Sequence, residues 1–186
     1  MLAYVFWHIR RENVSAPDYE TAHGAFHDSL WATPVPGLLG LRRYRVAQIP
    51  WLTPGRGAYE DWHLLDDSAA LDVLNEAAVT RARLAAHDRI AGMAANGIAG
   101  LYGPRFGARI EPAYAYWMSK PDGMKYAEFD ASLQPFTANG CCLWGRRMTL
   151  GPTPEFCLHA PAAVELPHAA LAMKIDRLAS TGAPTV

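Results

Sequence analysis

The sequence has no surplus of basic residues and no long apolar run. Its 186 residues include 17 Lys and Arg against 18 Asp and Glu, which gives a formal charge of −1. Neutralising a phosphate backbone requires a basic surplus, so we expect no nucleic-acid partner. The apolar run near the start is too short for a signal peptide or a membrane span, so we expect no membrane association.

Cysteine is also scarce. The three cysteines, Cys141, Cys142 and Cys157, all lie in the C-terminal half. An odd and sparse set is typical of free thiols in a reducing compartment, not of a disulfide framework. Because 51% of the residues are hydrophobic and 19% are charged, there is enough apolar material for a packed core. We therefore expect a cytoplasmic globular protein.

Several motifs that mark common enzyme classes are missing. The sequence contains no G-x-G-x-x-G, no G-x-x-x-x-G-K-[ST] and no G-x-S-x-G, which disfavours nucleotide binding and a nucleophile-elbow hydrolase. It also contains no HExxH, CxxC or His-x-His cluster. We therefore expect no compact metal site.

What the sequence does contain is an internal repeat. Residues 3–10 (AYVFWHIR) and 113–120 (AYAYWMSK) are identical at three of eight positions, and both are aromatic-rich, as strands are. Three further matches follow in the same order: FHDSL (26–30) with FDASL (129–133), LRRYRVA (41–47) with WGRRMTL (144–150), and residues 61–64 with 155–158. Four matches in one order indicate two copies of one structural unit.

Each copy is predicted to run strand, helix, strand, strand, helix. Apolar residues recur at helical spacing over residues 19–30 in the first copy and over 126–133 in the second. A second helix is predicted over 67–79 and, in the other copy, over 164–179. With a closing strand, this order is the ferredoxin-like unit.

The two copies are expected to differ at their ends. The first, residues 1–110, adds a helix over about 80–96 and closes with a strand near 98–106. The second, residues 111–186, ends in STGAPTV (180–186), which is weak as a strand and which we expect to be a frayed tail. The second copy would then lack its last strand.

In its repeat and element order, over nearly the whole length, the chain resembles the dimeric α/β-barrel superfamily. Members of this superfamily pair two ferredoxin-like sheets face to face, either as dimers of short chains or as tandem repeats in one chain. The resemblance implies an α+β fold of two tandem ferredoxin-like repeats that form a barrel within the chain. Members include cofactor-free monooxygenases, haem-dependent enzymes, isomerases and ligand-binding proteins, so the resemblance implies a fold more firmly than a function.

Strand side chains alternate between two faces, which sorts the candidate site residues. Tyr4, Phe6 and His8 share one face of the first strand, and Tyr114 and Tyr116 share the matching face of its copy. The opposite faces are smaller and more aliphatic, which suits packing under helices. We therefore expect the aromatic and polar set to face the opposing sheet, inside the barrel.

The third strand of each copy adds more polar groups. Asp61 and His63 share one face in the first copy, and Glu155, Cys157 and His159 share one face in the second. Together with His8 they would converge on one interior cavity. An apolar pocket with a few convergent polar groups is the default hypothesis for a site.

Each of these residues also has a structural interpretation. A lone His8 or His63 is more often a hydrogen-bonded structural residue, and Cys157 is more often a small buried hydrophobe than a nucleophile. Arg42 and Arg146, each the first residue of an Arg-Arg pair, would simply alternate on half-exposed strands. Turned inward, they would suit an anionic substrate.

From this cavity we predict a small-molecule enzyme of the cofactor-independent oxygenase or isomerase type. His63 or His8 would act as general base because imidazole titrates near working pH, and Asp61 would orient the ring. The substrate would be aromatic or polyketide-like. The expected substrate-binding residues are Tyr4, Phe6, Tyr114, Tyr116, Cys157, His159, Arg42 and Arg146.

Two other functions stay open. The resemblance implies haem as one alternative cofactor, with His168 or His87 as the axial ligand. The second alternative is a non-enzymatic ligand-binding protein. Met118 occupies the position in the second copy that His8 occupies in the first, which is the pattern expected if one half has lost its catalytic residues.

The sequence also leaves a metal site and a homodimer to consider. Zinc or non-haem iron would suit the ligand types of His8, His63, His159, Asp61 and Glu155, but their spacing is dispersed. A homodimer could form through an uncovered strand edge in the second copy.

Overall fold

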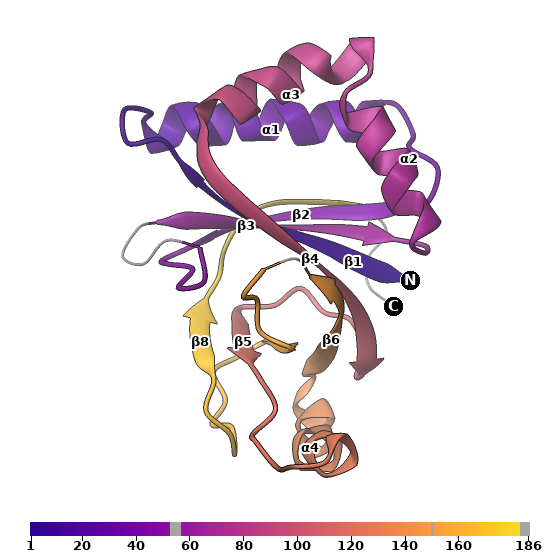
Figure 1. Cartoon of the computed structure of the whole chain (residues 1–186), viewed down its shortest axis with the longest axis vertical. Helices are drawn as coiled ribbons and strands as arrows, with labels where there is room; N and C mark the ends of the chain where they lie inside the picture. Colours follow the sequence, from indigo (N-terminus) through magenta and orange to yellow (C-terminus); the bar gives the residue numbers. More distant parts are fainter. Residues whose placement is uncertain (53–56, 150, 183–186) are drawn as a thin grey trace.

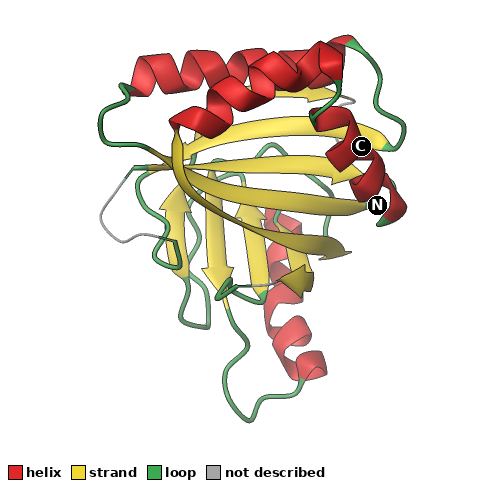
Figure 2. Ribbon diagram, turned by 45° about the horizontal axis from the view of Figure 1, so that its top comes forward, coloured by secondary structure: helices red, strands yellow, loops and turns green. Residues whose placement is uncertain are grey.

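In a computed structural model, which describes residues 1–52, 57–149 and 151–182, the described strands form one antiparallel sheet that folds over on itself (Figure 1). The strand order in this nine-stranded sheet is β8-β5-β7-β6-β4-β1-β3-β2-β9. The strands of the two halves cross each other in direction, and three helices cover the outer face of the first half (Figure 2). Within the described ranges, no helix is both long and apolar enough to span a membrane.

Both halves have the ferredoxin-like strand order. The first half consists of β1 (Leu2–Arg10), α1 (Ala16–Ala32), β2 (Leu38–Val46), β3 (Ala58–Leu65), α2 (Ala69–Ala78), α3 (Arg81–Met93) and β4 (Ala94–Phe106). The second half consists of β5 (Tyr114–Met118), α4 (Tyr126–Leu133), the 3-10 helix η1 (Gln134–Asn139), β6 (Cys142–Thr149), β7 (Phe156–Ala160) and β8 (Leu171–Lys174). Their orders are β4-β1-β3-β2 and β8-β5-β7-β6, which confirms the α+β fold of tandem ferredoxin-like repeats in an intrachain barrel.

The helix predicted over residues 164–179 is wrong. This segment contains β8 and most of β9 (Asp176–Gly182) instead. Met173 and Ile175 are buried while Lys174 and Asp176 are exposed, which is the period of a strand, and Pro167 disfavours a helix that continues through it. β8 pairs with β5 and so supplies the last strand that we expected the second copy to lack. β9 belongs to the other side of the sheet, where it pairs with β2. Of the expected tail 180–186, residues 183–186 lie outside the described part of the chain.

The interior of the barrel is filled by large aromatic side chains. Trp7, Trp62, Trp117 and Trp144 are almost completely buried there, together with Tyr102. The ring centroids of Trp7 and Trp117, which occupy matching positions of the repeat, are 5.1 Å apart. The two halves therefore meet through a close-packed aromatic core.

Glu60 lies at the centre of this core. Its carboxylate accepts hydrogen bonds from the indole nitrogens of Trp7 at 2.9 Å, Trp62 at 2.6 Å and Trp117 at 3.2 Å. Burial raises the pKa of Glu60 to about 7, and the three indole donors oppose that rise. The carboxylate thus ties together strands of both halves, a role that the sequence did not suggest.

The predicted alternation of the first strand is correct, but its two faces are exchanged. Ala3, Val5 and Trp7 fill the barrel interior, whereas Phe6 and His8 lie beneath the helices. The barrel interior needs the bulkiest flat side chains to fill the space between two sheets, so the tryptophans occupy it. The prediction that the aromatic and polar face of this strand lines a cavity inside the barrel is therefore wrong.

The sequence match between the third strands, β3 and β7, is also out of register with the pairing in the structure. Trp7 lies opposite Glu60 in the ladder, and its counterpart Trp117 lies opposite Cys157. Glu60 and Cys157 are thus equivalent, whereas the sequence match paired His63 with Cys157. An odd shift along a strand moves a side chain to the other face of the sheet. This is why His63 and Cys157 are on different faces.

Candidate functional site

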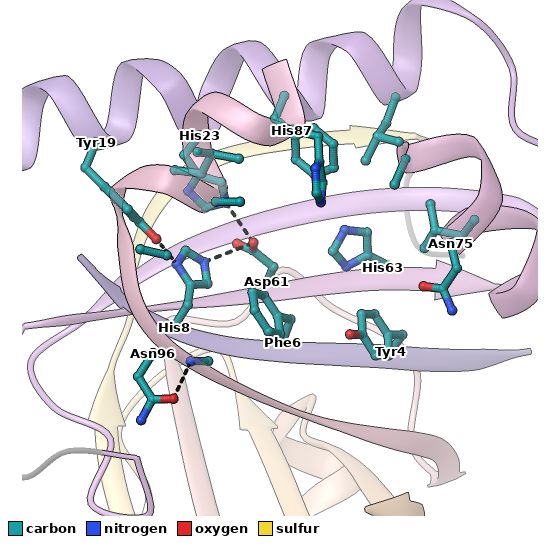
Figure 3. Close-up of a pocket in the computed structure, with 18 of the residues that line it drawn as sticks. Tyr4, Phe6, His8, Tyr19, His23, Asp61, His63, Asn75, His87 and Asn96 are labelled. Atoms are coloured by element: carbon teal, nitrogen blue, oxygen red, sulfur yellow. Dashed lines mark hydrogen bonds and ion pairs between the residues drawn. The ribbon is translucent and has the colours of Figure 1, made fainter. Parts of the chain in front are cut away.

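A pocket of about 390 Å³ lies between the first half of the sheet and the helices above it (Figure 3). β1 and β3 form its floor, and α1, α2, α3 and the first residues of β4 supply the rest of its walls. Most of the wall is apolar, with side chains such as Phe26, Leu30, Leu74 and Ile90. The volume is within the range of small-molecule sites, about 300–1,000 Å³.

Local sequence determines which face of α1 points into this pocket. Ser15 caps the helix by accepting a hydrogen bond from the Asp18 backbone nitrogen at 3.2 Å, and Pro17 occupies its first turn. Tyr19, His23 and His27 follow at intervals of four residues, and all three are buried. Residues four apart share one face of a helix, so the three side chains face the sheet together.

The floor residues are aligned by strand pairing. In the antiparallel ladder of β1 and β3, Phe6 lies opposite Asp61 and Tyr4 lies opposite His63. His8, two residues beyond Phe6, has the same facing. The sheet therefore presents two histidines and one carboxylate to the helix that carries two more histidines.

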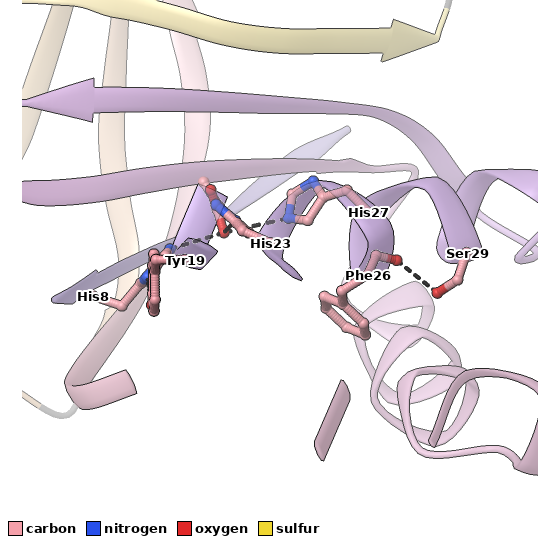
Figure 4. Close-up of polar contacts among 7 residues, drawn as sticks. His8, Tyr19, His23, Phe26, His27 and Ser29 are labelled. Atoms are coloured by element: carbon pink, nitrogen blue, oxygen red, sulfur yellow. Dashed lines mark hydrogen bonds and ion pairs between the residues drawn. The ribbon is translucent and has the colours of Figure 1, made fainter. Parts of the chain in front are cut away.

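Three imidazoles converge on a single carboxylate oxygen. Asp61 Oδ2 lies 2.7 Å from His23 Nε2, 3.1 Å from His8 Nε2 and 3.3 Å from His27 Nε2 (Figures 3 and 4). All four side chains are at most 5% exposed. The other oxygen, Asp61 Oδ1, has no hydrogen-bond partner within the described ranges.

The charges in this cluster follow from burial and from mutual contact. Burial alone would raise the pKa of Asp61, but His23, His27 and His8 hold it well below its usual range. Burial lowers the pKa of His23, and it lowers the pKa of His27 to about 4, with Asp61 opposing the change in both. At neutral pH the cluster therefore holds an ionised carboxylate, and His23 and His27 are neutral imidazoles.

Tyr19 completes the contacts of His8. An ionised carboxylate only accepts hydrogen bonds, so the His8 nitrogen that contacts Asp61 carries the proton. The other ring nitrogen, His8 Nδ1, then accepts a hydrogen bond from the Tyr19 hydroxyl. Burial and the charge of Asp61 raise the pKa of Tyr19, so its hydroxyl stays protonated. Both nitrogens of His8 are therefore engaged.

His63 lies next to this cluster but outside its hydrogen bonds. Its ring centroid is 5.2 Å from that of His27 and 5.7 Å from that of Tyr4, and its Nδ1 has no partner among the described residues. Burial and the neighbouring His27 lower the pKa of His63 to about 4. It is therefore a neutral imidazole that lines the pocket and has one buried nitrogen without a partner in the described ranges. Asp61, which we expected to orient His63, contacts His8 instead.

The structure brings five of the predicted site residues into this pocket: Tyr4, Phe6, His8, Asp61 and His63. His87, the haem-ligand candidate on α3, also lines it and projects into it in Figure 3. These residues share one surface because alternate positions of β1 and β3 face the same helices.

The other predicted residues lie elsewhere. Cys157 is packed in the barrel core, and the ring of His159 packs against Trp62 in a tilted arrangement with a centroid distance of 4.4 Å. Tyr116 and the half-buried Tyr114 belong to the cluster beneath α4. The expectation that both halves contribute to one cavity is wrong for these residues, because the packed aromatic core separates the second half from the pocket.

The two arginines and the second haem-ligand candidate are also remote from the pocket. Arg42 is buried with its Nε 3.4 Å from a carboxylate oxygen of Glu111. Arg146 is exposed and donates to the Thr153 backbone oxygen at 2.6 Å. His168 lies in an irregular segment, not on a helix, and its Nε2 is 2.6 Å from the Ser132 hydroxyl. None of the three is among the residues that line the pocket.

Sequence reasoning missed Tyr19, His23 and His27 as site residues. The signal was present as a histidine pair four residues apart on a predicted helix, continued by a tyrosine four residues earlier. At helical spacing these residues looked like core positions. Only the packing of α1 over β3 shows that they surround a carboxylate.

The pocket fits haem poorly. His87 offers an imidazole, but its Nδ1 is 3.1 Å from a carboxylate oxygen of Asp88. None of the described residues that line the pocket is Arg or Lys, so haem propionates would lack a cationic partner. Asp61 would add a buried negative charge.

No protein-family model matches the chain, and no curated protein matches it. Among solved structures, one from Fusobacterium nucleatum described as a putative monooxygenase has a TM-score of 0.66 at 11% identity, over 100% of this chain and 95% of that one. Another, described in the same words and from Lactobacillus acidophilus, has a TM-score of 0.62 at 11% identity, over 100% and 97%. A third, described as a putative chlorite dismutase, has a TM-score of 0.49 at 11% identity over 95% of both chains.

At 11% identity, the first two likenesses show a shared fold and do not establish an activity. They extend over the whole chain, so both halves of the repeat correspond. The chain therefore has the dimeric α/β-barrel fold that its repeat predicted, with both halves of the barrel supplied by one polypeptide.

Proposed function

We propose that the chain is a small-molecule enzyme that removes a proton from an aromatic or polyketide-like substrate in the pocket under α1 and α3. The observation that supports this most is the imidazole of His63, whose Nδ1 has no partner among the described residues, in the lining of an apolar pocket and beside an ionised carboxylate. A small apolar pocket with a few convergent polar groups suits a flat, weakly acidic molecule.

His63 is the general base in this proposal. Its lowered pKa, about 4, keeps the ring in the base form at neutral pH. The negative charge of Asp61 works against that lowering, so it would stabilise the imidazolium that forms when His63 takes a proton. Tyr4 and Phe6, whose rings are stacked at 8° to each other, would hold the substrate flat against the floor.

His8 has a different role from His63. Because both of its nitrogens are engaged, by Tyr19 and by Asp61, it has no free lone pair for a substrate proton. We assign it as a positioning residue that fixes the orientation of Asp61. Asn75 and Asn96, at the ends of the pocket, would orient polar groups of the substrate.

The reaction after proton removal is either oxygenation or isomerisation. In oxygenation, the carbanion forms a carbon–oxygen bond to O2, and the resulting hydroperoxide loses water across its O–O bond to leave a carbonyl, so that a CH2 group and O2 become C=O and H2O. The substrate itself supplies the electrons that reduce the second oxygen atom. Return of the proton to another carbon instead gives an isomerase. The likeness to proteins described as monooxygenases is a reason to measure oxygen uptake first. Neither outcome requires an organic cofactor.

The test is exchange of an acidic C–H for deuterium, followed by NMR with a panel of enolisable aromatic ketones and phenols. We expect the wild-type chain to accelerate exchange for at least one compound and His63→Gln to abolish it while the compound still binds. His168→Gln, which changes a histidine outside the pocket, is the matched control and should retain the exchange rate. Equal exchange in His63→Gln and wild type would overturn the assignment.

The alternatives give different results in the same experiment. Binding without exchange for every compound that binds would favour a non-enzymatic ligand-binding protein. Saturable uptake of haemin with a Soret band, lost in His87→Ala, would favour the haem alternative.

A further inference from the structure

We infer that His8, His23, His27 and Asp61 form a binding site for a divalent transition-metal ion, of the type that prefers imidazole and carboxylate ligands. The sequence predicted no compact metal site, because the candidate ligands considered there, including His8 and Asp61, are dispersed along the chain, and His23 and His27 were not among them. The fold brings them together from β1, α1 and β3.

The spacing of the donor atoms is the first argument. In a tetrahedral site with metal–ligand distances of about 2.0–2.2 Å, neighbouring ligand atoms are about 3.3–3.6 Å apart. The three imidazole nitrogens are 2.7–3.3 Å from Asp61 Oδ2. The donor atoms of His8, His23 and Asp61 lie within 4.8 Å of one another. An ion between these three donors requires the side chains to move apart, and His27, whose Nε2 lies 3.3 Å from Asp61 Oδ2, would close in as the fourth ligand.

The hydrogen bonding is the second argument. All three imidazoles point at the same carboxylate oxygen, while Asp61 Oδ1 is buried and has no partner in the described part of the chain. A cluster held by hydrogen bonds alone would share its donors between the two oxygens, because a buried acceptor without a partner is costly. Three imidazole nitrogens and one carboxylate oxygen are thereby gathered in one place, as the ligands around an ion are.

The supporting residues are the third argument. Metal-bound histidines commonly use their second nitrogen to hold a fixed orientation, and Tyr19 contacts Nδ1 of His8 in this way. His23 and His27 are held four residues apart on one face of α1. Ligands on helices and strands are positioned more firmly than ligands on loops.

Arg43 sets a limit on the affinity. It lies opposite Asp61 in the ladder of β2 and β3, and its guanidinium packs against Gly24 of α1. This buried positive charge is close enough to lower the pKa of both His23 and His27. It would also repel a cation, so we expect micromolar rather than nanomolar affinity.

The site forms one wall of the pocket described above. A catalytic use of the ion, such as polarising a substrate oxygen next to His63, rests on the proposed function. Binding of the ion does not rest on it, and the two are measured separately.

The test is titration of the full chain, first stripped with a chelator, with Zn²⁺ by calorimetry and with Co²⁺ by visible absorption. We expect a single ion per chain and an intense Co²⁺ spectrum of the tetrahedral type. His23→Ala and His27→Ala should each weaken Zn²⁺ binding by about tenfold or more. His168→Gln, which changes a histidine outside the pocket, is the matched control and should bind as the wild type does.

Two outcomes would overturn the inference: no Zn²⁺ uptake by the wild-type chain, or equal affinity in the wild type and in His23→Ala and His27→Ala. Circular dichroism shows whether the variants fold, and Tyr19→Phe, which keeps every ligand, offers a milder variant that we expect to bind severalfold more weakly. Zn²⁺ binding without substrate exchange would contradict the proposed function alone. Exchange without Zn²⁺ binding would contradict the metal site alone.

Discussion

Glu60 and Asp61, neighbours in β3, point to opposite faces of the sheet and are each held by three nitrogen donors of one kind. Glu60 lies in the barrel among the indoles of three tryptophans. Asp61 lies beneath the helices among the imidazoles of three histidines. One strand thus carries the centre of the core on one face and the centre of the candidate site on the other.

Glu60→Gln should destabilise the fold. An amide has one oxygen and a donor group in place of two oxygens, so at least one indole N–H would lose its acceptor, at a cost of about 1–3 kcal/mol. Urea unfolding followed by tryptophan fluorescence measures the change. Glu165→Gln, at an exposed position, is the control and should leave the free energy of unfolding unchanged.

Glu60 should also make stability depend on pH. Its folded pKa of about 7 is above the usual value of 4.5, so the native state binds more protons than the unfolded state between these values. The contribution of Glu60 to the free energy of unfolding therefore falls as pH rises from about 4.5 to about 7. The deficit of Glu60→Gln relative to wild type should be larger at about pH 5 than at about pH 8. A deficit independent of pH would contradict this.

Buried histidines should destabilise the fold as pH falls, which is the opposite of the pH dependence expected from Glu60. Burial lowers the pKa of His27 and His63 to about 4 and that of His159 to about 3. Unfolded histidines titrate at about 6.5, so below that pH the unfolded chain binds more protons. The free energy of unfolding should fall as pH drops from about 6.5 to about 4, by up to about 1.4 kcal/mol for each unit of pKa shift.

His159→Phe separates one of these contributions from the others. His159 Nε2 has no partner among the described residues, and the ring packs against the aromatic ring of Trp62, so phenylalanine should be tolerated at neutral pH. Urea unfolding between about pH 7 and about pH 4.5 should show a shallower loss of stability than in the wild type. Parallel curves for the two proteins would rule out the charging of His159 as a cause.

Metal binding should reverse the tautomer of His8. Without metal, Nε2 carries the proton that is donated to Asp61, and Nδ1 accepts from Tyr19. A metal bound at Nε2 requires the proton on Nδ1. Long-range ¹H–¹⁵N correlation spectra should show this change on addition of Zn²⁺. An unchanged His8 tautomer at saturating Zn²⁺ would mean that His8 is not a ligand.

Gly107→Ala, in the connection between β4 and β5, should lower the stability of the protein more than Gly123→Ala does. Both glycines have positive φ, 84° and 76°, so either substitution costs about 1–2 kcal/mol of backbone strain. At Gly107 an added Cβ would also overlap the Cys141 backbone oxygen, whereas at Gly123 nothing lies within 4 Å. Thermal unfolding of the two variants, compared side by side, isolates the steric part. Equal losses would contradict it.

The local periodicity of the chain was enough to predict most of the fold. Alternation in residues 3–10 and helical spacing in residues 19–30 are properties of neighbouring residues, and β1 and α1 cover those segments. The repeat added the ferredoxin-like order because copies of one sequence pattern adopt one local structure. Residues 164–179 were misjudged because β8 and β9 owe their form to pairing with the distant β5 and β2.

Alternation along the sequence predicted which residues share a face of each strand, and it placed His8, Asp61 and His63 among the site candidates. Which face meets which partner depends on the packing of elements that are distant in the chain. Alternation divides side chains into two sets but carries no information about what packs on each, and the bulk of the tryptophans assigned one set to the barrel. His23 and His27 joined the candidate site for the same reason, because the contact between α1 and β3 spans residues far apart in the chain.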